Sequence, residues 1–381
     1  VLRKGEGEVR WQGRTELGWY GIRDAIAGEL RLSRWPAEDI ASFMEWEVPL
    51  SGEVSGRATA RGRRSDPAGE AHVTLSEGTY FDVAFERARV EARWEDHEAR
   101  VEAGEMRLGG GTASFSGTLT QGGIYDGRGE MRSVDLGALL PSPPGPAVFA
   151  GRISGELLLE GTLDRPRLRG HVTSPGLFLG DEGIGALDAR LTGTGDGRLA
   201  IDARCRSGRV DLDLEGRVGT VSPYEADLRF RARDTSLDPF VRAVKPTLPP
   251  TVSLVASGAM SLDGPLARLE DVRASAQLDD LRFLLPDYPI HSREPVRLDV
   301  EGGRVRLNAF HLAGEGTDLE VTGGLDLLGD GPLGINARGR ADLRALSVVT
   351  RRLRGSGAAR LSVEVTGTRS DPRVSGALDL E

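Results

Sequence analysis

The sequence has very few of the residues that build disulfides, metal sites or nucleophilic catalytic sites. Its only cysteine is Cys205, so no internal disulfide can form. The chain has five histidines, His72, His97, His171, His291 and His311. None of them belongs to an HExxH pattern or to a paired Cys/His spacing, and no GxSxG motif occurs. We therefore predict no metal, no cofactor, no catalytic residues and no enzymatic activity.

Long apolar runs and clusters of basic charge are also missing. No stretch of about 18 apolar residues is present, so the sequence predicts no membrane-spanning helix. The 58 acidic and 49 basic residues are interleaved without a basic stripe, which argues against nucleic-acid binding. The chain lacks an initiating Met and both ends fall inside strand-like patterns. We expect a piece of a longer protein, with targeting or anchoring segments outside it.

Glycine is abundant, with 52 of 381 residues, which is about twice its ordinary usage. A pattern of strand, glycine turn, bend and second strand occurs four times. Its turn glycines are Gly62, Gly161, Gly264 and Gly367, spaced 99 to 103 residues apart. Short segments with helical spacing recur near residues 36–46, 134–141, 236–246 and 341–353. A period near one hundred residues predicts a repeat array.

Proline-rich bends follow two of the helical segments, at residues 141–146 and 245–250, and they suggest where units begin and end. The predicted division is a partial unit at 1–46, repeat units at 47–146, 147–249 and 250–353, and the start of a further unit at 354–381.

Strict alternation of apolar and polar residues is the dominant local signal. Val210, Leu212 and Leu214, for example, are separated by acidic residues that include Asp213. Such alternation predicts strands with one apolar side and one side in water. Helices long enough for parallel crossovers are missing, so the strands should pair antiparallel. Cys205 continues the apolar parity of its strand and should be a buried small hydrophobe.

Two other features have less specific interpretations. The glycine-rich stretches 180–185 and 193–197 resemble phosphate loops, but neither opens a helix, so they should be hairpin turns. Trp11, Trp19 and Trp35 cluster near the start of the chain. They could plug an end of the array or belong to an ordinary core, and we favour the core.

The alternating apolar residues form the candidate binding surface. If the sheet curls into a trough, its inner face becomes a continuous apolar groove, and an acyl chain is the plausible ligand. The predicted lining is Val90, Ala92, Leu157, Leu159, Leu199, Ile201, Val210, Leu212, Leu214, Leu228, Phe230, Val296, Leu298, Val300, Leu319, Val321, Leu361, Val363 and Val365.

The repeated strand–turn–strand sequence itself resembles that of a known family. Its clearest copies are SGELLLEGTLDRPRLRGHV at residues 154–172 and LSVEVTGTRSDPRVSGAL at 361–378, and SLDPF at 236–240 adds to the likeness. These segments resemble the repeat of the translocation and assembly module (TamB) family and the wider AsmA-like group, which are bacterial relatives of the bridge-like lipid-transfer proteins. The resemblance extends over about residues 50–381. Its motifs are strand-and-turn patterns and carry no catalytic signature.

This resemblance implies an all-β fold: an elongated array of antiparallel strands curled into a U-shaped trough (a β-taco) with an apolar inner face and short helices between units. It further implies a protein anchored in the inner membrane that crosses the periplasm of a double-membrane bacterium. Such proteins carry phospholipid towards the outer membrane, and some assist outer-membrane protein assembly with a barrel partner. The anchor and the barrel-binding region would lie outside this chain.

Three hypotheses remain open from the sequence. The first is a lipid conduit along the apolar groove. The second is a structural or assembly scaffold that aids outer-membrane protein insertion or secretion and fills its trough with its own side chains. The third is a β-solenoid, which predicts parallel coils of about 20–25 residues and fits the long period poorly.

Overall fold

The protein is described by a computed structural model. It describes residues 1–18, 21–43, 50–63, 66–80, 83–120, 123–139, 149–162, 165–193, 195–244, 253–285, 288–326, 330–343, 357–368 and 370–380.

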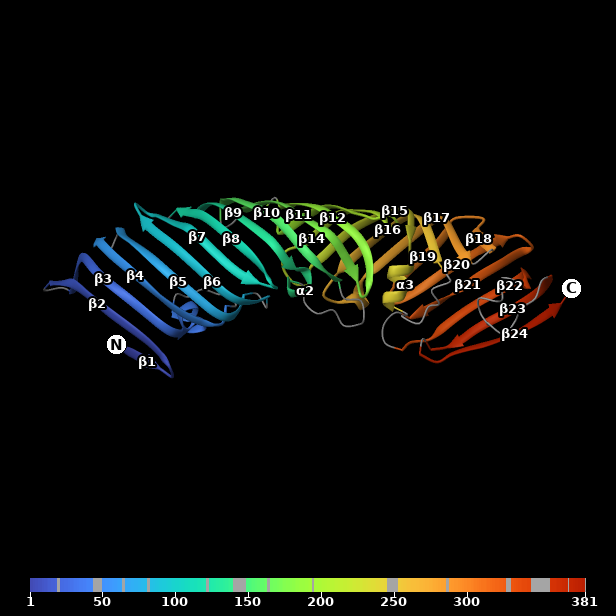
Figure 1. Cartoon of the computed structure of the whole chain (residues 1–381), viewed down its shortest axis with the longest axis horizontal. Coiled ribbons are helices and arrows are strands. Elements are labelled where there is room, and N and C mark those ends of the chain that lie inside the picture. Colours follow the sequence, from blue (N-terminus) through green and yellow to red (C-terminus); the bar gives the residue numbers. More distant parts are fainter. Residues whose placement is uncertain are drawn as a thin grey trace. The chain divides into compact units, whose positions relative to one another are not determined.

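The described residues form one long antiparallel sheet of 24 strands, with few and short helices. Each strand pairs with the strands before and after it in the chain wherever its register is defined, and the only exception is an interrupted strand described below. Figure 1 shows this succession by colour. The sequence prediction of an all-β, antiparallel fold is therefore confirmed, and the parallel coils of a β-solenoid are excluded for these strands.

The chain divides into two compact units, Val1–Leu177 with Arg190–Asp196, and Phe178–Ala189 with Gly197–Glu381. We call them unit 1 and unit 2. The elements of unit 1 are β1 (Leu2–Lys4), β2 (Gly7–Gly18), β3 (Gly21–Pro36), α1 (Ala37–Phe43), β4 (Glu53–Arg63), β5 (Asp66–Tyr80), β6 (Val83–Glu95), β7 (Glu98–Leu108), β8 (Gly111–Thr120), β9 (Ile124–Asp135), α2 (Leu136–Leu139), β10 (Phe149–Thr162) and most of β11 (Arg165–Leu179).

The division passes through β12 (Glu182–Gly193). The remaining elements belong to unit 2: β13 (Arg198–Arg206), β14 (Asp211–Gly219), β15 (Glu225–Ser236), α3 (Asp238–Val244), β16 (Ser253–Pro265), the 3-10 turn η1 (Leu269–Asp271), β17 (Arg273–Leu285), β18 (Tyr288–Ser292), β19 (Val296–Glu301), β20 (Arg304–Gly314), β21 (Thr317–Asp326), β22 (Leu333–Asp342), β23 (Ala358–Gly367) and β24 (Pro372–Leu380).

Six strands separate one helix from the next. Helix α1 follows β3, α2 follows β9 and α3 follows β15, so three of the four predicted helical segments are confirmed. The fourth segment begins with the end of β22, and its residues 344–353 lie outside the described part of the chain. The glycine-rich stretch 180–185 begins at the β11–β12 connection, as predicted for a hairpin turn. Of the stretch 193–197, residue 194 lies outside the described part of the chain, and residues 195–197 lie between β12 and β13.

The four turn glycines lie at the ends of equivalent strands. Gly62, Gly161, Gly264 and Gly367 have φ of 106°, 124°, 126° and 93° and end or nearly end β4, β10, β16 and β23. Only glycine adopts this left-handed region readily, which explains its recurrence.

A β-bulge recurs before each helix. The register between β3 and β4, β9 and β10, and β15 and β16 shifts there, and a non-glycine residue with φ between 40° and 52° occupies the preceding strand. Its backbone N–H donates to a serine Oγ on the following strand. The three pairs are Arg34 with Ser55 (2.9 Å), Ser133 with Ser154 (3.0 Å), and Asp234 with Ser257 (2.9 Å). Bulges bend a strand and raise its local twist.

A glycine follows each of these serines. A Cβ added at Gly56, Gly155 or Gly258 would lie 2.4, 2.5 or 2.2 Å from a backbone oxygen of the next strand. The repeated Ser–Gly dipeptide therefore has two physical causes. The serine Oγ accepts a hydrogen bond from the bulge N–H on the preceding strand, and the glycine lets the backbone of the following strand approach closely.

One strand of unit 2 is interrupted. β18 and β19 both pair with β17 and with β20, and together they take the place of a single strand. Glu294, in the break, accepts hydrogen bonds from the backbone N–H of His311 (2.6 Å) and pairs with its ring Nδ1 (2.8 Å). These contacts tie the break to β20.

Candidate functional site

The strand registers of unit 1 assemble an apolar face. We use the word row for residues that lie directly opposite one another on successive strands. One row runs Leu2, Val9, Leu32, Gly56, Val73, Val90, Gly104, Phe115, Gly129 and Leu157. The next runs Trp11, Leu30, Ala58, Ala71, Ala92, Val101, Gly117, Gly127 and Leu159.

Two further rows flank these on the same face. One is Trp35, Val54, Leu75, Ala88, Met106, Ala113, Met131 and Gly155; the other is Gly13, Gly28, Ala60, Gly69, Trp94, Ala99, Leu119, Tyr125 and Gly161. None of these four rows contains a charged residue. The alternating positions on the other face are polar, for example Gln12, Glu29, Thr59, Glu70, Arg93, Arg100, Thr118, Asp126 and Glu160.

Aromatic rings fill the space above glycines on this face. The Trp11 ring lies where a Cβ on Gly28 would be, at 2.4 Å, and the Trp94 ring does the same at Gly69, at 2.5 Å. The Phe115 ring occupies the equivalent space over Gly104, at 2.4 Å. Each ring thus covers bare backbone on a neighbouring strand, which keeps the surface apolar where a side chain is missing.

Unit 2 has an apolar face of the same kind. Its longest row crosses eleven strands and runs Ala203, Leu214, Phe230, Met260, Ala276, Leu298, Leu307, Gly323, Ile335, Val365 and Val374. Flanking rows are Ile201, Gly216, Leu228, Leu262, Ala274, Val300, Val305, Leu325 and Leu333, and Cys205, Leu212, Ala232, Gly258, Leu278 and Val296.

The registers bring the predicted lining residues onto these faces. Four of them, Val90, Ala92, Leu157 and Leu159, lie in the rows of unit 1. The others except Val210 lie on the apolar face of unit 2, including Leu319, Val321, Leu361 and Val363 on β21 and β23 and Leu199 on β13. Val210 differs, because it precedes β14 and is almost completely buried, at 1% exposure. Whether any of these residues contacts a lipid stays a prediction.

Several residues of the faces were missing from the predicted lining. They include Trp11, Trp94, Phe115, Leu119 and Met260. Their positions fit the alternation of apolar and polar residues along each strand. Neighbouring glycines interrupt that alternation, so the pattern is hard to recognise in the sequence. Trp11 is 56% exposed, so it is no part of a closed core; Trp35 is half-buried, and Trp19 lies outside the described residues.

Most of the apolar face stays partly open in the described part of the chain. The chain exposes 23791 Å², about 1.6 times the roughly 14,600 Å² expected for a compact protein of 40.8 kDa. The row residues are mostly half-buried rather than buried, and Phe115, Leu119 and Met260 are exposed. That area includes the charged face, but a face of partly exposed apolar side chains is typical of a binding surface.

One region of unit 2 is closed by the protein itself. Ala256, Leu281, Val296 and Phe310 are buried together, and Leu237, just before α3, packs against them. Helix α3 is fixed there because the buried Asp238 carboxylate accepts hydrogen bonds from the Leu254 N–H (2.8 Å) and the Ser253 hydroxyl (2.7 Å). The apolar face is therefore self-filled near the helix.

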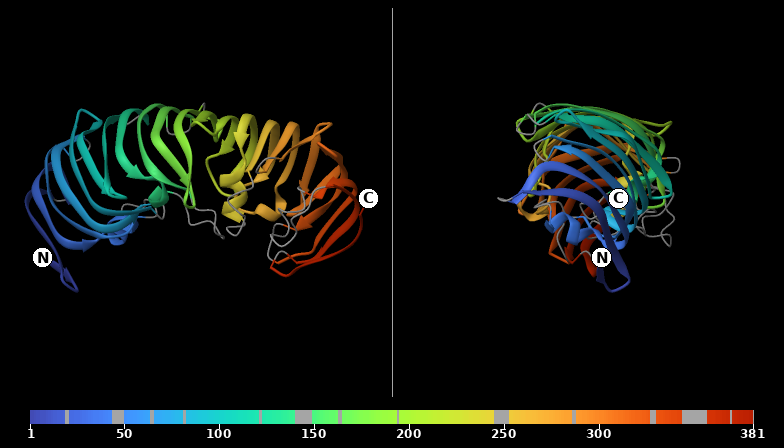
Figure 2. Two further views of the ribbon diagram at one scale, coloured as in Figure 1. Left: turned by 45° about the vertical axis from the view of Figure 1, so that its right-hand side comes forward. Right: turned by 90° about the vertical axis from the view of Figure 1, so that its left-hand side faces the viewer.

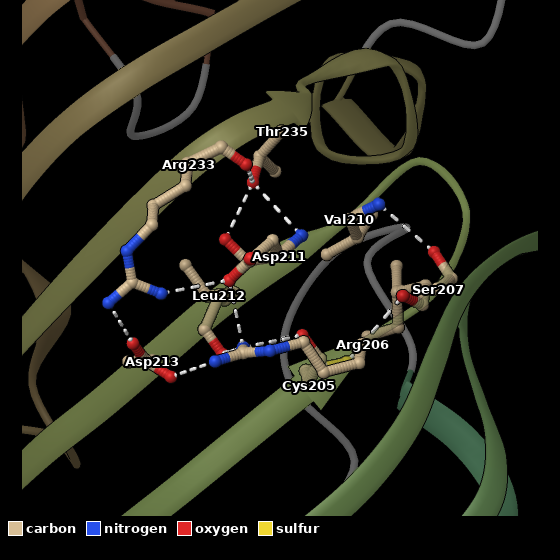
Figure 3. A network of polar contacts seen from close by, with 10 residues as sticks. Cys205, Arg206, Ser207, Val210, Asp211, Leu212, Asp213, Arg233 and Thr235 are labelled. Carbon is tan, nitrogen blue, oxygen red and sulfur yellow. Dashed lines mark hydrogen bonds and ion pairs between the residues drawn. The ribbon is translucent and has the colours of Figure 1, made fainter.

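The charged face next to α3 carries an ion-pair network, drawn in Figure 3. Asp213 lies between two guanidinium groups: its Oδ1 accepts a hydrogen bond from Arg206, and its Oδ2 lies 2.8 Å from Arg233 Nη2. The hydrogen bond from Arg206, supported by Arg233, lowers the pKa of Asp213 below its usual range. The interpretation of Asp213 as a merely solvated residue was therefore incomplete.

Cys205 sits beside this network with its thiol pointing to the apolar side. It is 7% exposed, and its Sγ lies 3.5 Å from the carbonyl oxygen of Ile184. Burial raises the pKa of the Cys205 thiol. The prediction of a buried small hydrophobe is confirmed.

No known protein family, curated protein or solved structure matches this chain. The apolar faces must therefore be interpreted from their own geometry. Within the described ranges, no helix is long and apolar enough to cross a bilayer. In the same part of the chain no group of three or more His, Cys, Asp or Glu side chains is placed to hold a metal ion.

Proposed function

We propose that the apolar face of each unit holds lipid acyl chains, and that the chain is part of a bridge-like protein carrying phospholipid between the inner and outer membranes. The observation that carries this proposal is the set of rows that cross each unit without a charged side chain, while most of the same face stays open. Lipid transfer needs that combination and needs no catalytic group.

The energetics favour an acyl chain as the ligand. Exposing a lipid tail to water costs about 0.8 kcal/mol for each CH2 group. Val, Leu, Ala and Met side chains along a row offer apolar contacts on strands about 4.8 Å apart, with glycines at some of the strands between them. Such a surface recognises no particular tail, so it would accept chains of different length and saturation.

We further propose that each unit is a trough with its apolar face inside. The strands within each unit are visibly curved in Figure 2. Val90, Ala92 and Trp94 are half-buried although the described strands form one sheet, whereas Arg89, Glu91 and Arg93 between them are exposed. This difference is expected when the apolar side chains line the inner side of a bend.

The location and partners in this proposal rest on the family resemblance of the repeated sequence. The proposed location is the periplasm of a double-membrane bacterium. The protein would be held there by an inner-membrane anchor outside this chain, and it would bind an outer-membrane barrel protein through another region outside it.

Charge insertion on one face, matched by the same change on the other, tests the proposal. Leu214→Arg in unit 2 and Val90→Glu in unit 1 put a charge among the rows, while Glu215→Arg and Arg89→Glu change the adjacent charged-face positions. We expect the first pair to lower lipid transfer between donor and acceptor liposomes by about tenfold or more, because a charge in an acyl-chain path costs several kcal/mol. The control pair should transfer lipid at nearly the wild-type rate.

The closed region near α3 favours a second candidate, a scaffold with a self-filled core. Under that function Leu214→Arg would bury an unpaired charge and unfold its unit, whereas an open face lets the charge reach water. Circular dichroism melting of the four variants separates these outcomes: loss of folded signal in the apolar-face variants alone would contradict the lipid proposal.

A further inference from the structure

The charged face of unit 2 has a hollow that the lipid proposal does not use. A cavity of about 790 Å³ lies over β20 to β24 and is lined by four arginines, Arg293, Arg338, Arg340 and Arg360. Two aspartates, Asp318 and Asp379, and the hydroxyl-bearing Thr317 and Ser362 also line it. The volume is in the range of small-molecule sites.

Strand register brings the cationic groups together. Arg340 on β22 lies directly opposite Arg360 on β23, and Asp318 and Asp379 lie at the two ends of the same row. Like charges placed directly opposite each other on neighbouring strands are unfavourable unless opposite charge is close. Arg293 comes from the break between β18 and β19, and its Nη1 lies 3.1 Å from Asp318 Oδ2.

Short side chains make room between these arginines. The row next to Arg340 and Arg360 runs from Glu320 through Arg338 and Ser362 to Ala377. The result is a depression with long guanidinium side chains around short ones.

A second cavity on the same face serves as a comparison. It measures about 460 Å³ and is lined by three arginines, Arg229, Arg231 and Arg297, and by three acids, Asp213, Glu215 and Asp299. Its lining charges balance, whereas four arginines and two aspartates line the first cavity, with Glu320 on β21 directly opposite Arg338 as a further acid just outside the lining. That excess is local, since the whole chain carries a net charge of −9.

We propose that the cavity lined by Arg338, Arg340 and Arg360 binds a phosphate-bearing anion. Guanidinium groups donate paired hydrogen bonds that match phosphate oxygens, and the Ser362 hydroxyl can add another. The ligand is either a soluble phosphate ester or the headgroup of an anionic lipid at a membrane surface. This anion site does not depend on the lipid proposal, because the cavity lies on the opposite side of the sheet from the apolar face.

The test measures binding of pyrophosphate, the soluble probe, to the whole chain by calorimetry. Arg338→Gln with Arg340→Gln removes two charges from β22, and Arg229→Gln with Arg231→Gln removes two from β15 with the same spacing. Wild type should bind pyrophosphate, the first double variant should bind it about tenfold or more weakly, and the second should match wild type. Circular dichroism verifies that both variants are folded.

Flotation with vesicles distinguishes the two ligand sources. Binding to phosphatidylcholine vesicles that contain phosphatidylglycerol, lost in the first double variant alone, assigns a lipid headgroup. Pyrophosphate binding without vesicle binding assigns a soluble phosphate ester. The proposal is overturned if wild type binds neither probe, or if both double variants weaken binding equally.

Discussion

At the residue scale, the glycines divide into those that the fold requires and those that it tolerates. Position 258 must be glycine, because a Cβ there would lie 2.2 Å from the Gln277 carbonyl oxygen and 2.7 Å from the Leu278 Cα. Gly334, on β22 of the same unit, has no atom within 4 Å of that position and no positive φ. The two positions therefore form a matched pair.

We predict that Gly258→Ala destabilises unit 2 by about 1–3 kcal/mol, because the β16–β17 pairing must open to admit the methyl group. Gly334→Ala should instead be neutral or stabilise by up to about 1 kcal/mol, since it restricts only the unfolded chain. Urea unfolding followed by circular dichroism gives both values. Equal effects at the two positions would show that the close approach at Gly258 is not limiting.

The Asp213 ion pairs predict a pH dependence. The folded-state pKa of Asp213 is lowered, so its stabilising contribution is complete above the unfolded value of about 3.9 and is lost as the pH falls through the folded value. Asp213→Asn should thus lower the urea midpoint at neutral pH. The difference from wild type should shrink as the pH falls below about 4.

Asp227→Asn is the control, because Asp227 is exposed on the same charged face. It should change the midpoint little at any pH. A difference for Asp213→Asn that stays constant down to pH 3 would mean that the carboxylate acts through packing, not through charge.

At the element scale, the repeated bulge explains why the sequence has a period. Each helix follows a strand whose bulge residue donates its N–H to a serine on the next strand. We predict that Ser154→Ala costs about 1 kcal/mol, because the Ser133 N–H loses its acceptor at a strained, positive-φ position.

The matched control is Ser116→Ala, on an exposed position of β8 in the same unit. Thermal melting of both variants measures the difference. If Ser116→Ala costs as much as Ser154→Ala, the bulge contact has no special role.

The elements themselves were largely predictable. Alternation fixes which residues share a face, and the turn glycines at 62, 161, 264 and 367 mark equivalent strand ends. The bulges were not predictable, because Arg34, Ser133 and Asp234 have no common side chain that would signal a positive φ. The interruption between β18 and β19 also has no clear signal, since Glu294 acts through contacts with His311, 17 residues away.

At the scale of each unit, the apolar face was predictable as a set but its details were not. Parity identified Leu214, Phe230 and Leu298, and the register then put them in one row. Nothing in the sequence indicated that Trp94 would cover Gly69 or that Asp213 would be held by two arginines, because both depend on cross-strand neighbours. The arginine-lined cavity was missed for the same reason.

At the scale of the whole molecule, the exposed apolar side chains and the uncharged rows lead to the central claim that the apolar faces carry lipid. Native mass spectrometry of the purified chain, with solvent extraction of whatever it holds, tests this most directly. The account predicts bound phospholipid that is reduced in Leu214→Arg and Val90→Glu but retained in Glu215→Arg and Arg89→Glu. A lipid-free mass in the wild-type chain, with nothing recovered even after incubation with liposomes, would contradict it.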